Sequence, residues 1–228
     1  MASVLITGAN KGLGLETARR LVLAGHTVYL GSRDVARGEE AAAATGAQFV
    51  QLDVTSDESV EAAAAAVPSL DVLINNAGIA PEWTPSGVVG ADAVTADLMR
   101  ETFEVNLFGM VRVLHAFLPL LERSEAPVVV NVSSRLASLA TAAAGTGYPG
   151  VAYPVSKAAV NMVTVQYAKA YPKMRINAVE PGFTATDLNA GSGRQTVEQG
   201  AEIIVRMAQI GPDGPTGGYF DAQGPLPW

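Results

Sequence analysis

Short apolar runs of strand length alternate with longer helical stretches along most of the 228-residue chain. The runs are unbroken and rich in Val, Leu and Ile, as strands buried on both faces are. Strands are expected at residues 3–6, 27–31, 48–52, 72–75, 128–132, 175–179 and, more weakly, 218–220. Helices are expected at residues 12–23, 35–45, 57–67, 96–123, 151–171 and 196–209. This alternation predicts a single α/β domain over residues 1–228, with a doubly wound parallel sheet of about seven strands and helices on both faces.

Local signals place the helix ends and the loops. Asp57 and Thr196 are expected to N-cap helices, and Gly25 and Gly46 to end them. Three stretches, residues 79–94, 135–150 and 183–194, fit neither pattern, and each follows a predicted strand. We therefore expect them at the carboxyl edge of the sheet, where such folds bind their ligands.

Composition narrows the classes of protein that remain. Lys and Arg number 15 against 22 Asp and Glu, a net charge of −7, which argues against nucleic acid or an anionic membrane as partner. The chain has no Cys and only two His, which excludes thiolate chemistry and argues against a metal site. No apolar run reaches the roughly 18 residues of a membrane span, and residues 1–6 leave no room for a signal peptide. We expect a cytoplasmic protein.

A glycine-rich loop follows the first predicted strand and opens a helix. Its glycines are Gly8, Gly12 and Gly14, with Asn10, Lys11 and Leu13 between them. Glycines let the backbone approach a pyrophosphate, which then lies over the unpaired N–H groups of the helix. The alternative is an ordinary glycine turn, which the position after a strand and before a helix disfavours.

Further motifs follow in a fixed order: Asn75-Asn76-Ala77-Gly78, Asn106, Ser133-Ser134, Tyr153-x-x-x-Lys157 and Pro181-Gly182. With the Gly-x-x-x-Gly-x-Gly loop, this set resembles the short-chain dehydrogenase/reductase family over nearly the whole chain. The resemblance implies a Rossmann-type fold and a dinucleotide cofactor. The resemblance implies that the glycine loop, Tyr153 and Lys157 contact this cofactor. It also implies that Asp53 and Val54 contact the adenine, and that Asn75, Ala77 and Gly78 lie beside the adenine-side ribose. The residues that it implies around the nicotinamide half are Pro181, Gly182, Thr184 and Thr186.

The residues at the end of the second predicted strand are expected to determine whether the protein prefers NAD or NADP. An acidic residue there would bind the ribose 2′-hydroxyl, but Ser32 stands in that place and Arg33 follows it. A guanidinium can grip a 2′-phosphate, and Lys11 could approach from the other side. The set resembles the NADPH-dependent carbonyl reductase branch and predicts NADPH as cofactor. The alternatives are that Arg33 and Lys11 are solvated charges, and that Asp34 serves the ribose rather than capping the next helix.

Tyr153 and Lys157 lie four residues apart in a predicted helix and share one face. Lowering the pKa of a phenol by about 2 takes roughly 2.7 kcal/mol. An ammonium group about 5 Å away supplies about 3 kcal/mol at an effective dielectric constant of about 20. The pair is therefore predicted to make Tyr153 the acid–base group, although such a pair alone is common on helix surfaces.

The resemblance assigns the other catalytic roles. Ser134 would donate a hydrogen bond to the substrate oxygen, with Ser133 as the competing choice. Asn106 would bend its helix and hold a water linked to Lys157. The alternative is that Asn106 only stabilises the bend, and the two roles are compatible. The implied reaction is hydride transfer from NADPH to the carbonyl of a small apolar ketone, aldehyde or quinone. The rivals are a secondary-alcohol dehydrogenase using NAD or NADP, and a non-enzymatic redox sensor.

Two further expectations concern the substrate pocket and the partner. The expected pocket residues are Trp83, Leu136, Leu139, Tyr148, Phe183, Leu188 and Trp228. The helices at 96–123 and 151–171 carry few charges, so each needs cover on two sides. We expect a homodimer, with a tetramer possible as well. The alternative is that residues 135–150 cover these helices within one chain.

Overall fold

A computed structural model describes residues 1–84, 86–145 and 147–228. Among these residues an eight-stranded sheet has the order β10-β9-β8-β7-β4-β1-β2-β3. Its neighbouring strands pair in parallel except at the β9–β10 edge. The strands are β1 Ser3–Ile6, β2 Thr27–Ser32, β3 Gln48–Gln51, β4 Val72–Asn75, β7 Val128–Val132, β8 Arg175–Val179, β9 Tyr219–Asp221 and β10 Gly224–Pro225. The doubly wound sheet is confirmed; β10, only two residues long, is the strand that the sequence did not indicate.

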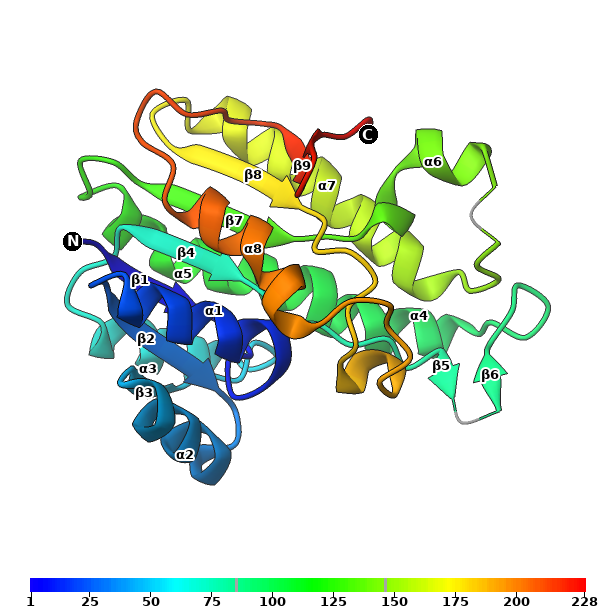
Figure 1. The fold of residues 1–228 in the computed structure, drawn as a ribbon, viewed down its shortest axis with the longest axis horizontal. Helices are drawn as coiled ribbons and strands as arrows, with labels where there is room; N and C mark the ends of the chain where they lie inside the picture. Colours follow the sequence, from blue (N-terminus) through cyan, green and yellow to red (C-terminus); the bar gives the residue numbers. More distant parts are fainter. Residues whose placement is uncertain (85, 146) are drawn as a thin grey trace.

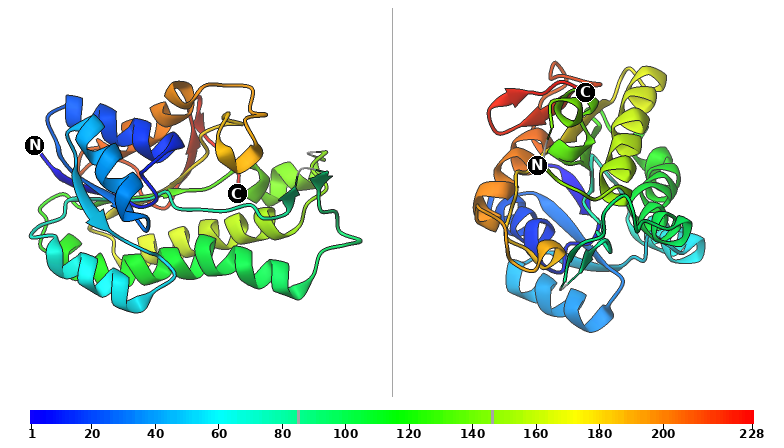
Figure 2. Two further views of the ribbon diagram at one scale, coloured as in Figure 1. Left: turned by 90° about the horizontal axis from the view of Figure 1, so that it is seen from below. Right: turned by 90° about the vertical axis from the view of Figure 1, so that its right-hand side faces the viewer.

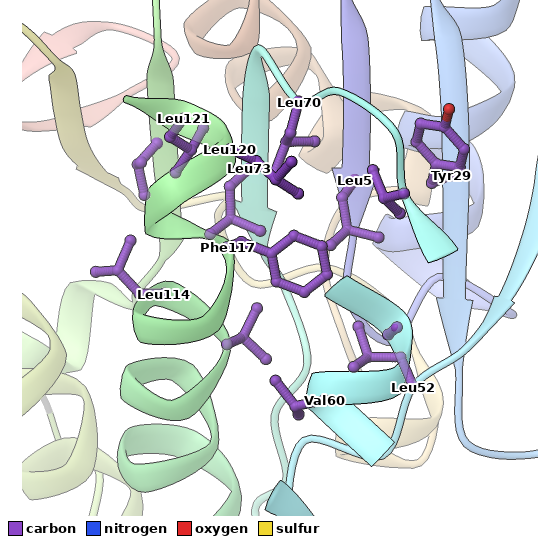
Figure 3. Close-up of a cluster of buried hydrophobic side chains, with 14 of the residues drawn as sticks. Leu5, Tyr29, Leu52, Val60, Leu70, Leu73, Leu114, Phe117, Leu120 and Leu121 are labelled. Atoms are coloured by element: carbon purple, nitrogen blue, oxygen red, sulfur yellow. The ribbon is translucent and has the colours of Figure 1, made fainter. Parts of the chain in front are cut away.

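Helices cover both faces of the sheet (Figure 1). α3 (Asp57–Ala66), α5 (Met110–Leu121) and α7 (Ala152–Ala170) lie on one face, and α1 (Gly12–Leu23), α2 (Val35–Thr45) and α8 (Val197–Ala208) lie on the other (Figure 2). Each layer buries an apolar cluster against the sheet. In the first, Phe117 of α5 is fully buried and packs among Leu5, Leu73 and Val60 (Figure 3). Burying one such side chain contributes roughly 1.5–3 kcal/mol.

The helix ends agree with the sequence signals except at one position. Ser56, not Asp57, caps α3: its side chain accepts from Ser59 N, and Asp57 is the first helical residue. Asp57 still favours the helix, because a carboxylate in the first turn interacts well with the helix dipole. Thr196 caps α8 through a capping box, and Gly46 ends α2 with a φ of 78°.

The long helix expected at 96–123 is not uniform. It consists of α4 (Ala96–Phe103), a π-helical segment (Glu104–Gly109) and α5. Asn106 lies in the π-helical segment, so the expected bend has a structural basis. The continuous helix Ala96–Leu121 is long and apolar enough to cross a membrane by length and composition alone, contrary to the sequence expectation. Its α5 part supplies Val113, Leu114, Phe117 and Leu121 to the core, as a core helix does.

The three irregular stretches gather near the carboxyl ends of the strands (Figure 1). The first contains the β5–β6 hairpin (Trp83–Thr84 with Gly87–Val88). The second contains a 3₁₀ turn (Arg135–Ala137) and α6 (Leu139–Ala143), and the third a 3₁₀ turn (Asp187–Asn189). Trp83 lies with its ring centroid 6.0 Å from those of both Tyr148 and Phe183, so all three stretches meet at one aromatic cluster.

Candidate active site

The glycine loop between β1 and α1 is packed too closely for side chains at two of its glycines. A Cβ at Gly8 would lie 3.0 Å from Ala77 Cα, and one at Gly14 would lie 2.6 Å from Asn76 Nδ2. Asn76 Nδ2 donates to the carbonyl oxygens of Thr7 (2.9 Å) and Gly8 (3.1 Å). The Asn75–Gly78 motif therefore holds the loop in shape, with Asn76 making the bonds.

The first turn of α1 presents backbone donors. Lys11 is the N-cap residue, its side chain makes no capping bond, and no acidic residue lies in the first turn. Unpaired N–H groups and the positive end of a helix dipole fit a pyrophosphate. The cradle therefore fits a dinucleotide, and Gly12, Leu13 and Gly14 are the residues that would hold its phosphates.

The segment after β8 lies opposite the glycine loop. A Cβ on Gly12 would lie 3.6 Å from Thr186 Cγ2, so Thr186 faces the glycine loop. Thr184 is buried, and its Oγ1 accepts from Gln195 Nε2 (2.9 Å) and donates to Gly182 O (3.1 Å). Pro181, Gly182, Thr184 and Thr186 thus line one ordered turn that Gln195 braces.

At the end of β2, Arg33 is exposed and makes no side-chain bond among the described residues. Asp34 caps α2, accepting from Arg37 N at 3.0 Å, as the sequence favoured. The structure places Lys11 differently from the expectation: its Nζ lies 2.7 Å from Asp187 Oδ2 and is paired there. Arg33 is therefore a cation at the end of β2 whose side chain has no partner among the residues that the structure describes.

Three other predicted cofactor residues, Asn75, Asp53 and Val54, have side chains that contact neighbouring parts of the protein. Asn75 is buried, and its Nδ2 donates to Asn131 Oδ1 (2.9 Å), so its side chain points into the layer between the sheet and α7. Asp53 Oδ1 accepts from Thr55 N and Thr55 Oγ1, which shapes the turn after β3, and Val54 is buried beside Gly109.

Tyr153 and Lys157 share one face of α7, and Lys157 Nζ lies 5.8 Å from the centroid of the Tyr153 ring. Lys157 Nζ donates to Val132 O at 2.7 Å. A Cβ on Gly78 would lie 3.4 Å from that Nζ and 3.3 Å from Asn106 Oδ1. Because Gly78 has no side chain, Lys157 and Asn106 can both approach it closely. Asn106 accepts from Ile79 N (2.8 Å) and donates to Ile79 O (2.9 Å) and Ser156 Oγ (3.0 Å).

The two serines after β7 have different environments. Ser133 is buried and donates to Asn161 Oδ1 at 2.6 Å, so its hydroxyl is already used. Ser134 is partly exposed, its Oγ accepts from Leu136 N at 3.3 Å, and its interaction with the Tyr153 phenol lowers the pKa of that phenol. Ser134 is therefore the serine that faces the acid–base candidate.

The pKa of Tyr153 departs from the expectation. Burial of the phenol raises its pKa to about 12; Glu180 and Glu82 add to the rise, and the Ser134 hydrogen bond opposes it. Burial lowers the pKa of Lys157 to about 8. The prediction that the Tyr153 pKa is lowered is wrong for the protein alone, because desolvation of the buried phenol raises the pKa and the charges of Glu180 and Glu82 add to the rise.

The expected pocket residues do not gather in one place; Leu136 is half-buried in the 3₁₀ turn after Ser134. Trp83, Tyr148 and Phe183 form the aromatic cluster described above. Trp228 stacks on Tyr219 with ring centroids 5.4 Å apart, and Tyr219 OH donates to Ser134 O at 2.6 Å, so the C-terminal segment folds back to the catalytic edge. Leu139 and Leu188 are exposed. Within the described residues no cluster of potential metal ligands occurs.

Sequence reasoning missed Glu82. This carboxylate is fully buried beside α7. The signal was present, since Glu82 is the only charged residue between Asp71 and Asp92.

The sheet, the glycine loop at its centre and the Tyr153–Lys157 pair at the same edge define a dinucleotide-binding oxidoreductase of Rossmann type. A family model for short chain dehydrogenases matches residues 2–197. Salutaridine reductase of Papaver bracteatum is 31% identical over 293 residues, covering 97% of this chain and 94% of the relative. For (+)-neomenthol dehydrogenase of Capsicum annuum, identity is 30% over 297 residues, with 95% and 94% covered.

Among solved structures, NADPH-bound carbonyl reductase from chicken fatty liver superimposes with a TM-score of 0.87 and 26% identity, covering 100% of this chain and 99% of that one. The chain belongs to the short-chain dehydrogenase family. It is an oxidoreductase of CH–OH and C=O groups, and the nicotinamide cofactor is that of the family.

Proposed function

We propose that this protein is an NADPH-dependent reductase of small apolar ketones, aldehydes or quinones. The observation that carries the proposal is the acid–base pair on α7, where Lys157 Nζ lies 5.8 Å from the centroid of the Tyr153 ring. This pair can pass a proton in either direction, so the reductive direction rests on Arg33, the exposed cation that favours NADPH. The name of the chicken carbonyl reductase structure, bound to NADPH, supports the same reading.

Each catalytic side chain has one task in this proposal. A nicotinamide cofactor held by the glycine loop would supply the hydride for the carbonyl carbon. Tyr153 gives its phenol proton to the carbonyl oxygen, and Ser134 donates a hydrogen bond to that oxygen, stabilising the charge that develops there. Lys157 holds positive charge near the resulting phenolate, and Asn106 fixes the neighbouring backbone at Ile79. The products are the alcohol and the oxidised cofactor.

NADPH is proposed over NADH because Arg33 is exposed and has no side-chain partner among the described residues at the end of β2. The place of an acidic residue is taken by Ser32, which is buried and donates to Asp34 O. The apolar substrate class is supported by the aromatic cluster of Trp83, Tyr148 and Phe183.

The test is loss of NADPH absorbance with a panel of apolar carbonyl compounds, repeated with NADH. We expect kcat/KM to be higher with NADPH, and Arg33→Ser to reduce that preference. A preference for NADH would contradict the cofactor assignment. Faster turnover of secondary alcohols with NADP or NAD at neutral pH would favour the dehydrogenase alternative.

We also propose a homodimer formed through the π-helical segment and α7. Phe108, Val155 and Met162 are 49%, 42% and 60% exposed, although all three are large apolar residues on these helices. The described part of residues 135–150 leaves them uncovered, which disfavours the single-chain alternative.

A further inference from the structure

Glu82 is a carboxylate without any exposed surface in the loop after β4. Its Oε2 accepts from Ala152 N at 2.7 Å, and its Oε1 accepts from Tyr148 OH at 2.8 Å. Gly150 comes so close to Oε1 that a Cβ there would collide with it. The chain around residues 148–152 is therefore folded onto this one carboxylate.

The bond to Ala152 is an N-terminal cap supplied from another part of the chain. The N-cap residue of α7 is Val151, which has no side chain able to cap, and Ala152 is the first residue of the helix. A carboxylate at this point satisfies an orphan N–H group and interacts favourably with the helix dipole. Tyr153 is the next residue, so the acceptor that fixes the first turn of α7 also fixes the phenol.

The geometry points to Glu82 as a positioning residue for Tyr153: its carboxylate anchors the first turn of α7 and ties Tyr148 to it. The inference rests on the proposed acid–base role of Tyr153. Glu82 touches neither the reacting atoms nor the glycine loop, and it acts through the Ala152 amide and the Tyr148 hydroxyl.

The charge of Glu82 also bears on Tyr153. The ionisable groups that face Tyr153 are Lys157 on its own helix, Glu82 after β4, Glu180 at the end of β8, Tyr219 on β9 and Tyr148. Arg135 faces Glu180 and Tyr219. Both carboxylates raise the pKa of the phenol, so replacing Glu82 by a neutral residue of the same size lowers it.

Two substitutions separate position from charge. Glu82→Gln keeps an amide oxygen for Ala152 N and an NH₂ group that can donate to Tyr148, but it removes the charge. Glu82→Ala removes the acceptor. Asp92→Asn is the matched control, because Asp92 is an exposed acid in the same loop.

We expect Glu82→Ala to reduce kcat by between about 10- and 100-fold, as small misplacements of catalytic groups do, with KM changing less. Glu82→Gln should recover most of that loss, while the alkaline limb of its pH–rate profile moves to lower pH. Hydrogen exchange of the backbone at residues 152–156 should speed up in Glu82→Ala and not in Asp92→Asn. This readout needs no turnover.

Wild-type kcat and exchange in Glu82→Ala would overturn the inference. If Glu82→Ala does not fold, Glu82→Asp decides, because it keeps the charge but draws the acceptor back from Ala152 N; wild-type kcat and wild-type exchange at residues 152–156 in that variant would overturn the inference. Failure of the proposed function has its own signature: Tyr153→Phe would then keep its turnover.

Discussion

Lys11 Nζ lies 2.7 Å from Asp187 Oδ2, so an ion pair joins the glycine loop to the segment after β8. Both side chains are more than half exposed. The pair lies beside the approach of Gly12 to Thr186. Lys11 was predicted to approach the 2′-phosphate of NADPH, and in the proposed NADPH complex Asp187 would compete with that phosphate for Lys11.

Asp187→Asn should free Lys11 and tighten NADPH binding. An exposed ion pair contributes about 0.2–1 kcal/mol, which corresponds to a gain of roughly 1.4- to 5-fold in affinity. NADH lacks the phosphate, so its affinity should not gain. The measurement is the Kd of each cofactor by fluorescence titration at low salt, since the effect is screened as salt rises. Asp97→Asn, which breaks the exposed Asp97–Arg100 pair, is the control. An equal gain for NADH would show that Lys11 is not a phosphate contact.

Tyr153→Phe should reduce kcat for carbonyl reduction by about 10²- to 10⁴-fold, the usual contribution of a general acid. The ring and its packing remain, so NADPH affinity should stay close to wild type. Stopped-flow or steady-state turnover and a cofactor titration check the two halves. Tyr167→Phe on the same helix should leave both unchanged. A Tyr153→Phe enzyme that keeps most of its kcat would remove the proposed acid–base role.

The sequence was a good guide to the fold because parallel strands and their helices have local signatures. Among the described residues, apolar runs located seven of the eight strands of the central sheet, and capping residues located several helix ends. The two-residue β10 carries too little pattern to stand out. The electrostatics of the site could not be predicted in the same way, since the pKa of Tyr153 is raised first by burial and then by Glu180 and Glu82, all of which depend on distant parts of the chain.

The side-chain contacts of Lys11 and Asn75 could not be predicted from the sequence for the same reason. The pairing of Lys11 with Asp187 joins residues 176 positions apart. The inward orientation of Asn75 follows from its register opposite Asn131 on β7. Both relationships exist only once the sheet has formed, whereas the Tyr153–Lys157 pair follows from helix periodicity alone.

Lys157→Met should stabilise the folded protein at neutral pH while removing activity. Burial lowers the pKa of Lys157 to about 8, against about 10.4 for an unfolded chain. Between these values the unfolded state binds more protons, so the free energy of unfolding rises with pH; below pH 8 the folded state carries the full penalty. Allowing for the lost bond to Val132 O, the gain at pH 7 is about 1–3 kcal/mol.

Urea unfolding at pH 7 and pH 10 measures this effect. The stabilisation by Lys157→Met should be larger at pH 7 than at pH 10, because the penalty in the wild type fades as the lysine loses its proton. Tyr153 acts oppositely above pH 10: its raised pKa makes the folded state bind more protons there, so stability falls in both proteins. Lys169→Met, at an exposed position of α7, should show no such difference. A Lys157→Met protein less stable than wild type at pH 7 would contradict the burial penalty.

The proposed dimer makes a prediction for Met162, which is 60% exposed on α7. One protomer has a mass of 23.5 kDa, so light scattering of the wild type should give about twice that value. Met162→Glu places a charge within the apolar interface, where an unpaired charge is costly, and the mass should fall towards that of the monomer. Leu23→Glu is the matched control, because Leu23 is 74% exposed on α1, on the other face of the sheet. Its mass should match the wild type. A wild-type protein that scatters as a monomer over micromolar concentrations would show that Phe108, Val155 and Met162 face solvent.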